Sequence, residues 1–131
     1  MVEEDLPEVN EIDKIAFEPL WHNSLESLTL AFNQSSLSTV AENPTQLIGY
    51  QISTAIPLSG HLARLAVRPE IQRQHIGYSL VYDMMAHFKK QGAWRITVNT
   101  QDDNFASLAL YDKIGFRRTG EQFPVFECPR R

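Results

Sequence analysis

The stretch from Val67 to Leu80 constrains the fold of this chain more than any other part of the sequence. The run from His61 to Val67 predicts a strand, which ends at Arg68–Pro69 because proline cannot donate to a β ladder. A short polar loop follows, and apolar residues then recur at the spacing of an amphipathic helix. The residues on its apolar side are Ile76, Leu80, Val81, Met84, Met85 and Phe88. A strand followed by a long helix predicts a sheet covered by helices.

The other segments fit the same layered plan. Helical spacing predicts a helix near residues 6–16, and Asn23–Ser24 is suited to cap a second helix. The expected order is α-α-β-β-β-α-β-α-β, which gives a mixed, mainly antiparallel central sheet flanked by helices, an α/β (α+β) fold. The predicted strands are 38–41, 47–53, 61–67 and 94–98, and two strand-like pieces around Pro124, 116–122 and 125–127, form the last β segment. The last two helices are 76–90 and 104–113.

Length and composition narrow the class of protein. The 131 residues suffice for one domain, 1–131, and 43% hydrophobic with 21% charged residues is typical of a globular protein. No apolar run approaches the roughly 18 residues of a transmembrane helix, so no membrane partner is expected. The N-terminus is acidic, unlike a signal peptide. A single cysteine, Cys128, excludes an internal disulfide framework and favours a reducing, cytoplasmic location.

The charges are distributed unevenly along the chain. Residues 1–60 hold nine acidic residues against one basic residue, Lys14, whereas residues 61–131 hold eleven basic and seven acidic residues. The formal net charge of −4 is the wrong sign for a duplex-binding protein, so no nucleic acid is expected. The division suggests an anionic ligand on the second half and a cationic one on the first. The alternative is an ordinary solvated acidic helix.

The loop from Gln72 to Ser79 is the candidate anion site. Free backbone N–H groups and the positive end of the helix dipole meet where this loop enters the helix. Gly77 permits close approach of a ligand to the backbone, and Arg73 can pair with a phosphate oxygen. A glycine in a first helical turn is equally explained by packing.

A second motif lies further along, and together the two resemble the GNAT superfamily of acyl-CoA N-acyltransferases, in particular its ribosomal-protein-alanine type. The family's first signature is V-x-P followed by Q/R-x-x-G-x-G/A, matched at Val67, Pro69 and Gln72 to Gly77. Its second, N-x-x-A-x-x-L-Y-x-K-x-G-F, is matched at Asn104, Leu110, Tyr111, Lys113, Gly115 and Phe116, with Ser107 in the alanine position. The resemblance covers residues 47–122 well and residues 1–46 loosely.

The resemblance implies a binding mode for acetyl-CoA, the acyl donor, with no metal. The pantetheine arm would lie along the strand at Leu65, Ala66 and Val67, where a backbone N–H polarises the thioester carbonyl. The pyrophosphate would be held by Gln72, Arg73, Gln74, His75, Ile76, Gly77, Tyr78 and Ser79. Asn104 would contact the pantetheine, and the Tyr111 phenol would lie near the sulfur.

Tyr111 is the one residue to which the resemblance gives a catalytic role. A phenol of pKa about 10 can protonate a leaving thiolate of pKa about 8.5, so Tyr111 is suited to act as general acid. The alternative is a core tyrosine whose hydroxyl caps a buried carbonyl.

Two positions depart from the pattern. His75 stands in place of the first loop glycine, and Asn99 stands where related N-terminal amine acetyltransferases often have a glutamate base. An asparagine cannot accept the proton that a protonated amine must lose. A water chain, His61, His22 or Glu18 remain as candidates for the base.

The start of the chain is a third departure. Members of the superfamily normally open with a strand that pairs with the hairpin, and this sequence begins at a helix. A naturally short form, a fragment of a longer protein, or a module that borrows a strand would each explain this. An exposed hairpin edge favours a homodimer or a missing segment.

Other residues carry weaker signals. Four histidines and Cys128 show no paired metal-ligand spacing, so no metal is expected. Trp21, His22 and Glu18 fall between the first two helices, where the superfamily usually binds its acceptor. An aromatic anchor for that turn explains them as well, and Cys128 is most simply a bystander.

The sequence therefore predicts an acetyl-CoA-dependent N-acetyltransferase that acts on a primary amine by direct transfer in a ternary complex. The acidic first half would attract a cationic acceptor, and the basic second half would hold the anionic donor. Protein N-termini, lysines, polyamines, aminoglycosides and amino acids all remain open as acceptors. The alternatives are a non-catalytic acyl-CoA-binding or regulatory module, alone or within a larger protein, and an α/β interaction domain that keeps the motifs for packing.

Overall fold

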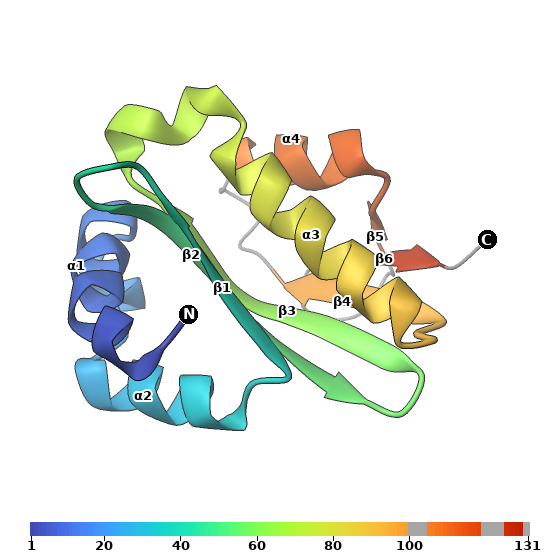
Figure 1. Ribbon diagram of the computed structural model, residues 1–131. Coiled ribbons are helices and arrows are strands. Elements are labelled where there is room, and N and C mark those ends of the chain that lie inside the picture. The colour runs from blue at the N-terminus through green and yellow to red at the C-terminus, as the bar shows by residue number, and fades with distance from the viewer. Residues whose placement is uncertain (100–104, 119–124, 130–131) are drawn as a thin grey trace.

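A computed structural model of the chain shows a six-stranded mixed sheet flanked by helices (Figure 1). It describes residues 1–99, 105–118 and 125–129, and at 72–74, 99, 105–108, 117–118 and 125–129 it describes the backbone only. The helices are α1 (Leu6–Ala16), α2 (Leu25–Gln34), α3 (Ile76–Lys90) and α4 (Phe105–Ile114), with short 3-10 turns at Glu3–Asp5, Pro19–Trp21 and Pro69–Gln74. The strands are β1 (Leu37–Glu42), β2 (Leu47–Ile56), β3 (Ser59–Val67), β4 (Arg95–Asn99), β5 (Arg117–Arg118) and β6 (Val125–Pro129).

The strands lie in the order β1-β2-β3-β4-β6-β5. Every pair is antiparallel except β3 and β4, which run parallel because α3 carries the chain across the sheet between them. The predicted mixed, mainly antiparallel sheet with helices is confirmed. β2 and β3 extend further than the predicted strands 47–53 and 61–67. Only Pro57–Leu58 forms the turn between them, and pairing resumes at Ser59 opposite Ile56.

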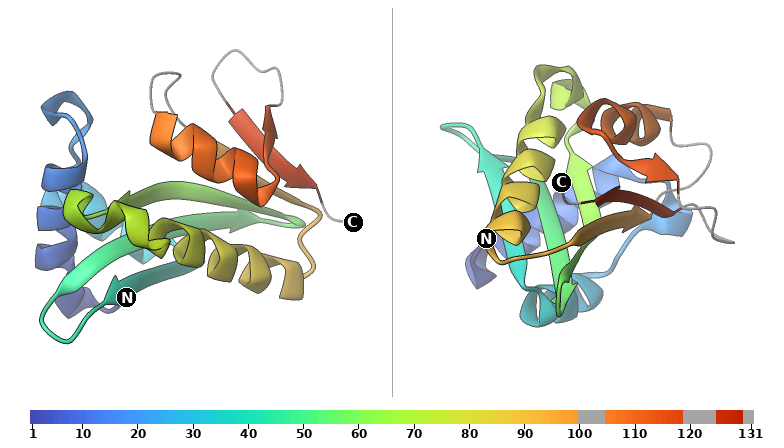
Figure 2. Two further views of the ribbon diagram at one scale, coloured as in Figure 1. Left: turned by 90° about the horizontal axis from the view of Figure 1, so that it is seen from above. Right: turned by 90° about the vertical axis from the view of Figure 1, so that its right-hand side faces the viewer.

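Two apolar cores lie on opposite faces of the sheet. α1 and α2 cover one face, where Val9, Ile12 and Leu28 pack against Tyr50 and Ile52 of β2. α3 and α4 cover the other face (Figures 1 and 2), in a cluster made of Leu62, Val81, Met84, Met85, Phe88, Ala93, Ile96, Val98, Tyr111 and Phe116. We call these the α1/α2 face and the α3/α4 face.

The close approach of α3 to the sheet depends on Gly60. A Cβ at this position would lie 2.6 Å from Cδ2 of Phe88, which is much shorter than a van der Waals contact. Phe88 is one of the apolar residues that define the predicted helix, and its ring occupies the space that glycine leaves. α3 is followed by Gly92 at φ 88°, a backbone angle that glycine adopts without strain.

The N-terminal part of the chain leads into the sheet through helices alone. Ser24 caps α2, its Oγ accepting from the Ser27 N–H at 3.1 Å, as the sequence predicts. In the part of the chain that the structure describes, β1 pairs with β2 alone, and the Met1 ammonium donates to the Ser38 carbonyl on this edge strand at 3.1 Å. No helix among the described residues has the length and apolar character needed to cross a membrane.

Candidate active site

β3 and β4 stay paired for only part of their length. Their parallel register runs from Ser59 opposite Arg95 to Leu62 opposite Val98. β3 then continues to Val67 in register with β2, while its described register with β4 ends at Leu62. A register shift against β2 falls in the same place, because Ile52 pairs with Arg64 while Ser53 pairs with Leu62. Ala63 is therefore the extra residue of a β-bulge, and bulges of this kind re-aim backbone and side chains next to active sites.

The three β3 residues predicted to carry the pantetheine lie directly after this bulge. Leu65 is half-buried and packs against the core of the α3/α4 face, whereas Ala66 lies in the core of the α1/α2 face. Val67 is buried and ends the strand. A strand that continues beyond its register with one neighbour can offer backbone groups on that side to an extended, amide-containing ligand.

The predicted pyrophosphate loop leads into α3 as the sequence indicates. A 3-10 turn, Pro69–Gln74, is followed by His75, the N-cap of α3, whose carbonyl accepts a hydrogen bond from the Ser79 N–H at 3.0 Å. The N–H groups of Ile76, Gly77 and Tyr78 precede that bond, so they are the donors that a helix of 15 residues presents to an anion. The side chains of Gln72, Arg73 and Gln74 lie outside the described part.

His75 adopts the left-handed conformation at φ 61° and ψ 21°. This region favours glycine, which explains physically why glycine is the usual residue at this position of the motif. The His75 side chain is exposed and makes no hydrogen bond that caps α3. His75 therefore differs from a glycine in two ways: its backbone is strained, and it places a side chain beside the N-terminus of α3.

Packing does not explain Gly77. A Cβ there would lie 3.4 Å from Cδ2 of Leu110 and 3.8 Å from Cγ2 of Val67, both ordinary contacts. The Cβ position faces α4 and β3 and has room for a methyl group, so the packing of α3, α4 and β3 does not require glycine at this position.

Tyr111 is buried in the cluster of the α3/α4 face. Its ring packs edge-on against Phe116 at a centroid distance of 5.6 Å. Burial raises the pKa of Tyr111 above its ordinary value of 10.0. Asn104, the other residue predicted from this motif, lies outside the described residues.

The candidates for the base lie in very different surroundings. Glu18 is exposed, and His22 Nε2 contacts the Phe17 carbonyl oxygen at 2.7 Å within the α1–α2 connection. His61 is half-buried on β3, where its Nδ1 lies 2.7 Å from Thr97 Oγ1 of β4. Burial lowers the pKa of His61 from its ordinary value of 6.5. Asn99 is the last residue of β4, two positions after Thr97.

A buried polar cluster fixes the α1–α2 connection, and sequence reasoning missed it. Asp13 is fully buried, and its Oδ1 accepts from Tyr50 Oη at 2.5 Å and from Arg64 Nε at 2.9 Å. Its Oδ2 accepts from the Asn23 N–H at 2.7 Å. The signal was the position of Asp13, since it follows Val9 by four residues and so shares the apolar side of α1.

Arg64 links this cluster to the exposed connection. Its NH2 nitrogen donates to the Trp21 carbonyl at 2.5 Å, and its Cζ lies 3.8 Å from the centroid of the Phe17 ring. Trp21 itself is 46% exposed. The connection that the resemblance associates with the acceptor is therefore held by its backbone, while its aromatic side chain remains accessible.

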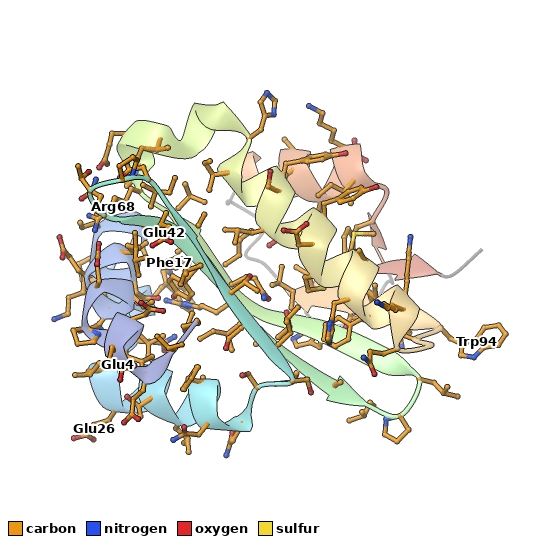
Figure 3. The ribbon with its side chains drawn as sticks, viewed as in Figure 1. Glu4, Phe17, Glu26, Glu42, Arg68 and Trp94 are labelled. Carbon is orange, nitrogen blue, oxygen red and sulfur yellow. The ribbon has the colours of Figure 1, made fainter. Side chains whose placement is uncertain are left out.

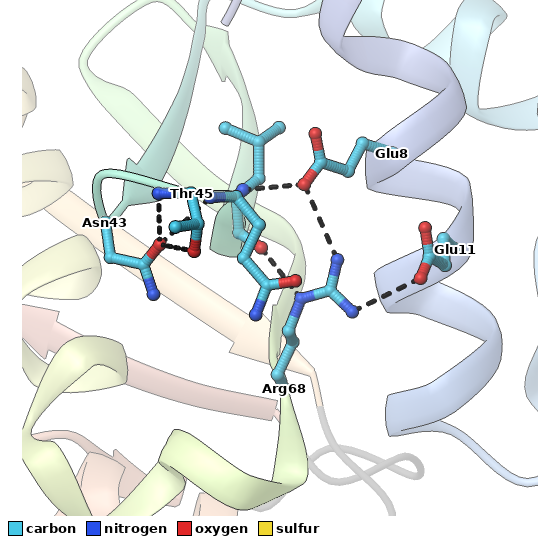
Figure 4. Close-up of polar contacts among 7 residues, drawn as sticks. Glu8, Glu11, Asn43, Thr45 and Arg68 are labelled. Atoms are coloured by element: carbon cyan, nitrogen blue, oxygen red, sulfur yellow. Dashed lines mark hydrogen bonds and ion pairs between the residues drawn. The ribbon is translucent and has the colours of Figure 1, made fainter.

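Arg68 performs a similar task at the start of the loop (Figure 4). Its Nε donates to the Leu47 carbonyl at 2.7 Å, and its guanidinium pairs with Glu8 at 3.5 Å and Glu11 at 3.4 Å. Glu8 also accepts from the Leu47 N–H at 2.7 Å. Figures 3 and 4 show Arg68 reaching from the end of β3 to α1. The helix, the hairpin and the loop are thereby joined.

These contacts change the interpretation of the charge distribution. Arg64 and Arg68 of the basic half pair with Glu8, Glu11 and Asp13 of the acidic half. Some of the opposite charges that were predicted to attract two ligands therefore pair with each other inside the protein. The exposed acids Glu18 and Glu26 stay available for a cationic ligand, with no ion pair to another described residue.

Comparison with known proteins adds independent findings. Residues 6–116 match the family described as the Acetyltransferase (GNAT) family. N-acetyltransferase family 8 member 3 of Mus musculus is 28% identical over 113 residues, which are 80% of this chain and 50% of that protein. The ribosomal protein bS18-alanine N-acetyltransferase of Escherichia coli K12 is 26% identical over 114 residues, or 86% of this chain and 74% of that protein. The chain thus spans about half the length of the first of these relatives.

A solved structure has the same fold. The PaiA N-acetyltransferase of Thermoplasma acidophilum, determined in complex with coenzyme A, matches with a TM-score of 0.87 and 21% identity. The match covers 99% of this chain and 96% of that one.

Proposed function

The chain belongs to the GNAT acetyltransferase family, and on this premise we propose that it transfers the acetyl group of acetyl-CoA to a primary amine of a peptide, protein or small molecule. One observation supports the proposal above the others. The part of β3 that continues beyond its register with β4, still paired with β2, leads through a six-residue 3-10 turn directly to the N-terminal amides of α3. A hydrogen-bonding strand edge therefore adjoins an anion site, as an amide-containing arm with a pyrophosphate requires.

The described residues suit this donor. Leu65 and Ala66 line opposite faces of the strand beyond the bulge, and the amides of Ile76, Gly77 and Tyr78 are available for phosphate oxygens. The PaiA relative was determined with coenzyme A, which supports the same class of donor for this chain. The relatives named for an alanine N-acetyltransferase favour an amine of a peptide or protein as acceptor.

In this proposal Tyr111 protonates the departing thiolate. Because burial raises its pKa, the phenol stays protonated throughout the physiological range and remains a donor. The same shift makes it a weaker acid than a solvated phenol, so the transfer depends on a thiolate forming close to the hydroxyl.

Replacing Tyr111 with phenylalanine separates an enzyme from a binding module. For an enzyme, kcat for amine-dependent CoA release should fall by about 10²-fold or more, while the Kd for acetyl-CoA stays within twofold. Phe116→Leu, a change to the ring that packs on Tyr111, controls for disturbed packing. An unchanged kcat in Tyr111→Phe would remove Tyr111 from the mechanism, and a wild type that binds acetyl-CoA without any turnover would favour the binding module.

A further inference from the structure

Residues from four strands form one row across the α1/α2 face of the sheet. His61 of β3 is the register partner of Thr54 on β2 and of Thr97 on β4, and Thr97 is in turn the register partner of Glu127 on β6. The neighbouring rung, Leu62 opposite Val98, faces the α3/α4 side, because both residues lie in that core. On the α1/α2 face His61–Thr97 is therefore the last rung before β3 and β4 part.

The row lies next to Asn99, the position at which related N-terminal amine acetyltransferases often have a glutamate base. Asn99 follows Thr97 by two residues, so the two strand positions share a face and are separated by about 6.6 Å. Arg64, the first residue beyond the bulge on β3, is directed to Asp13 and is occupied by that ion pair. His61 is a neutral proton acceptor that the strand register places on this face in the last rung of the β3–β4 ladder.

We propose that His61, positioned by Thr97, is the group that takes the proton from the acceptor amine and so replaces the carboxylate missing at position 99. The inference rests on the proposed acetyl transfer. When Nδ1 donates to Thr97 Oγ1 at 2.7 Å, Nε2 carries the lone pair that accepts a proton, directly or through one ordered water.

The proposed steps balance in protons and bonds. The acceptor ammonium gives one proton to Nε2 of His61, and the neutral amine nitrogen forms a bond to the thioester carbon. The carbon–sulfur bond then breaks, and the sulfur takes a proton from the Tyr111 phenol. One of the two protons on the attacking nitrogen passes to the Tyr111 phenolate, the other stays on the amide, and His61 releases its proton to solvent. The products are an amide, CoA thiol and one proton.

The two groups lie on opposite faces. Tyr111 belongs to the α3/α4 face, and His61 and Thr97 occupy the other face of the same two strands. The parting of β3 and β4 is the place where groups on both faces can reach one carbon. The donor would then approach from the α3/α4 side and the amine from the α1/α2 side.

Few charged groups neighbour His61. Arg95 precedes Thr97 by two residues on β4 and is exposed, Arg64 is paired with Asp13, and Thr54 on β2 is uncharged. Burial is the cause of the lowered pKa of His61, which keeps its imidazole neutral at pH 7. Glu127 is the remaining titratable residue in the register of this row, and the test has to include it.

The test is the pH dependence of kcat/KM between pH 5 and 9 for the wild type and four variants. The acceptors are a peptide beginning with alanine, lysinamide and spermidine, and acetyl-CoA affinity is measured for each variant. In His61→Gln, kcat/KM should be about 10²-fold lower than in the wild type near pH 6.5. The difference should shrink as the pH passes the pKa of the amine, because the amine is then already neutral. Thr97→Val should lower kcat/KM about tenfold and shift the acid limb of its pH profile. Thr54→Val and Glu127→Gln, in the same row, should follow the wild type.

Three results would overturn the inference. A His61→Gln variant that follows the wild type at every pH excludes His61 as the base. An acid limb removed by Glu127→Gln instead of His61→Gln assigns the proton to Glu127. If the wild type binds acetyl-CoA but acetylates none of the three amines, the proposed function fails and the inference falls with it. If His61→Gln does not fold, the pH profile of Thr97→Val decides. A purely structural role of the His61–Thr97 contact would leave that profile unchanged and would overturn the inference.

Discussion

Asp13 and Arg64 form an ion pair of 2.8 Å between α1 and β3, with the Asp13 side chain fully buried and that of Arg64 19% exposed. The pair joins the helix that precedes the α1–α2 connection to the residue just beyond the β3 bulge. Tyr50 and the Asn23 backbone complete the environment of the carboxylate. The Asp13 carboxylate therefore connects the α1–α2 connection, where the acceptor is proposed to bind, with the strand proposed to bind the donor.

Removing the charge of Asp13 should destabilise the fold. Asp13→Asn leaves a largely buried guanidinium without its counter-ion, and such a loss typically costs about 3 kcal/mol of unfolding free energy. Urea denaturation measures it, with Asp83→Asn, an exposed position on α3, as the control that stays within about 0.5 kcal/mol of the wild type. A loss below 1 kcal/mol in Asp13→Asn would mean that the cluster contributes little.

The two glycines near α3 should respond oppositely to alanine. Gly60→Ala places a Cβ 2.6 Å from the Phe88 ring and should cost about 1–3 kcal/mol of unfolding free energy. Gly77→Ala meets only Leu110 at 3.4 Å and gains helix propensity, so its stability should equal or exceed that of the wild type by up to about 1 kcal/mol. Thermal unfolding of both variants checks the contrast, and equal destabilisation would contradict it.

His75→Gly should stabilise the protein. The left-handed backbone at φ 61° costs a non-glycine residue about 1–2 kcal/mol, and the greater flexibility of unfolded glycine offsets part of that. The net gain in unfolding free energy should be about 0.5–1 kcal/mol. Ser79→Gly, four residues into the same region and inside α3, should instead lose about 1 kcal/mol. A loss of stability in His75→Gly would show that its side chain makes a favourable contact.

His61 should make the stability depend on pH. Its pKa is lower in the folded protein than the 6.5 of the unfolded chain, so below pH 6.5 the unfolded state binds more protons. The unfolding free energy should therefore fall as the pH drops below about 6.5 and level off once His61 is protonated in the folded state. Urea denaturation at pH 7.5 and 5.5 should show a smaller drop for His61→Gln than for the wild type, whereas His87→Gln should retain the full drop. An unchanged drop in His61→Gln would contradict the assignment.

The exposed acids near the α1–α2 connection should affect the acceptor alone. Neutralising Glu18 and Glu26 should raise KM for a cationic peptide about twofold to fivefold, since each exposed charge contributes up to about 1 kcal/mol. The Kd for acetyl-CoA should stay constant, and the effect should shrink at high salt. Glu42→Gln, an exposed acid at the end of β1, is the control (Figure 3). An unchanged KM would show that these acids do not attract the acceptor.

Local patterns in the sequence were sufficient for most of the fold. The spacing of Leu80, Met84 and Phe88 predicted α3, and Ser24 predicted where α2 begins. These features depend on residues close together in the chain, so periodicity and capping rules capture them. The donor loop and the role of Tyr111 stay predictions that follow from the two motifs.

Contacts between distant segments could not be predicted in this way. His61 and Thr97 are 36 residues apart, and Asp13 and Arg64 are 51 apart. Their meeting depends on strand register and on the bulge at Ala63, and a shift of one residue would turn every later side chain of β3 to the other face. The sequence therefore left the base open among a water chain and three side chains, and the strand register is the observation from which we propose His61.

The central claim is that this chain transfers an acetyl group to an amine. Its most direct test is mass spectrometry of a peptide beginning with alanine, together with lysinamide and spermidine, after incubation with acetyl-CoA and the wild-type protein. We expect an acetylated amine that accumulates in proportion to protein concentration and is strongly reduced with Tyr111→Phe. Acetyl-CoA binding without any acetylated amine would contradict the claim and would favour a module that holds acyl-CoA without using it.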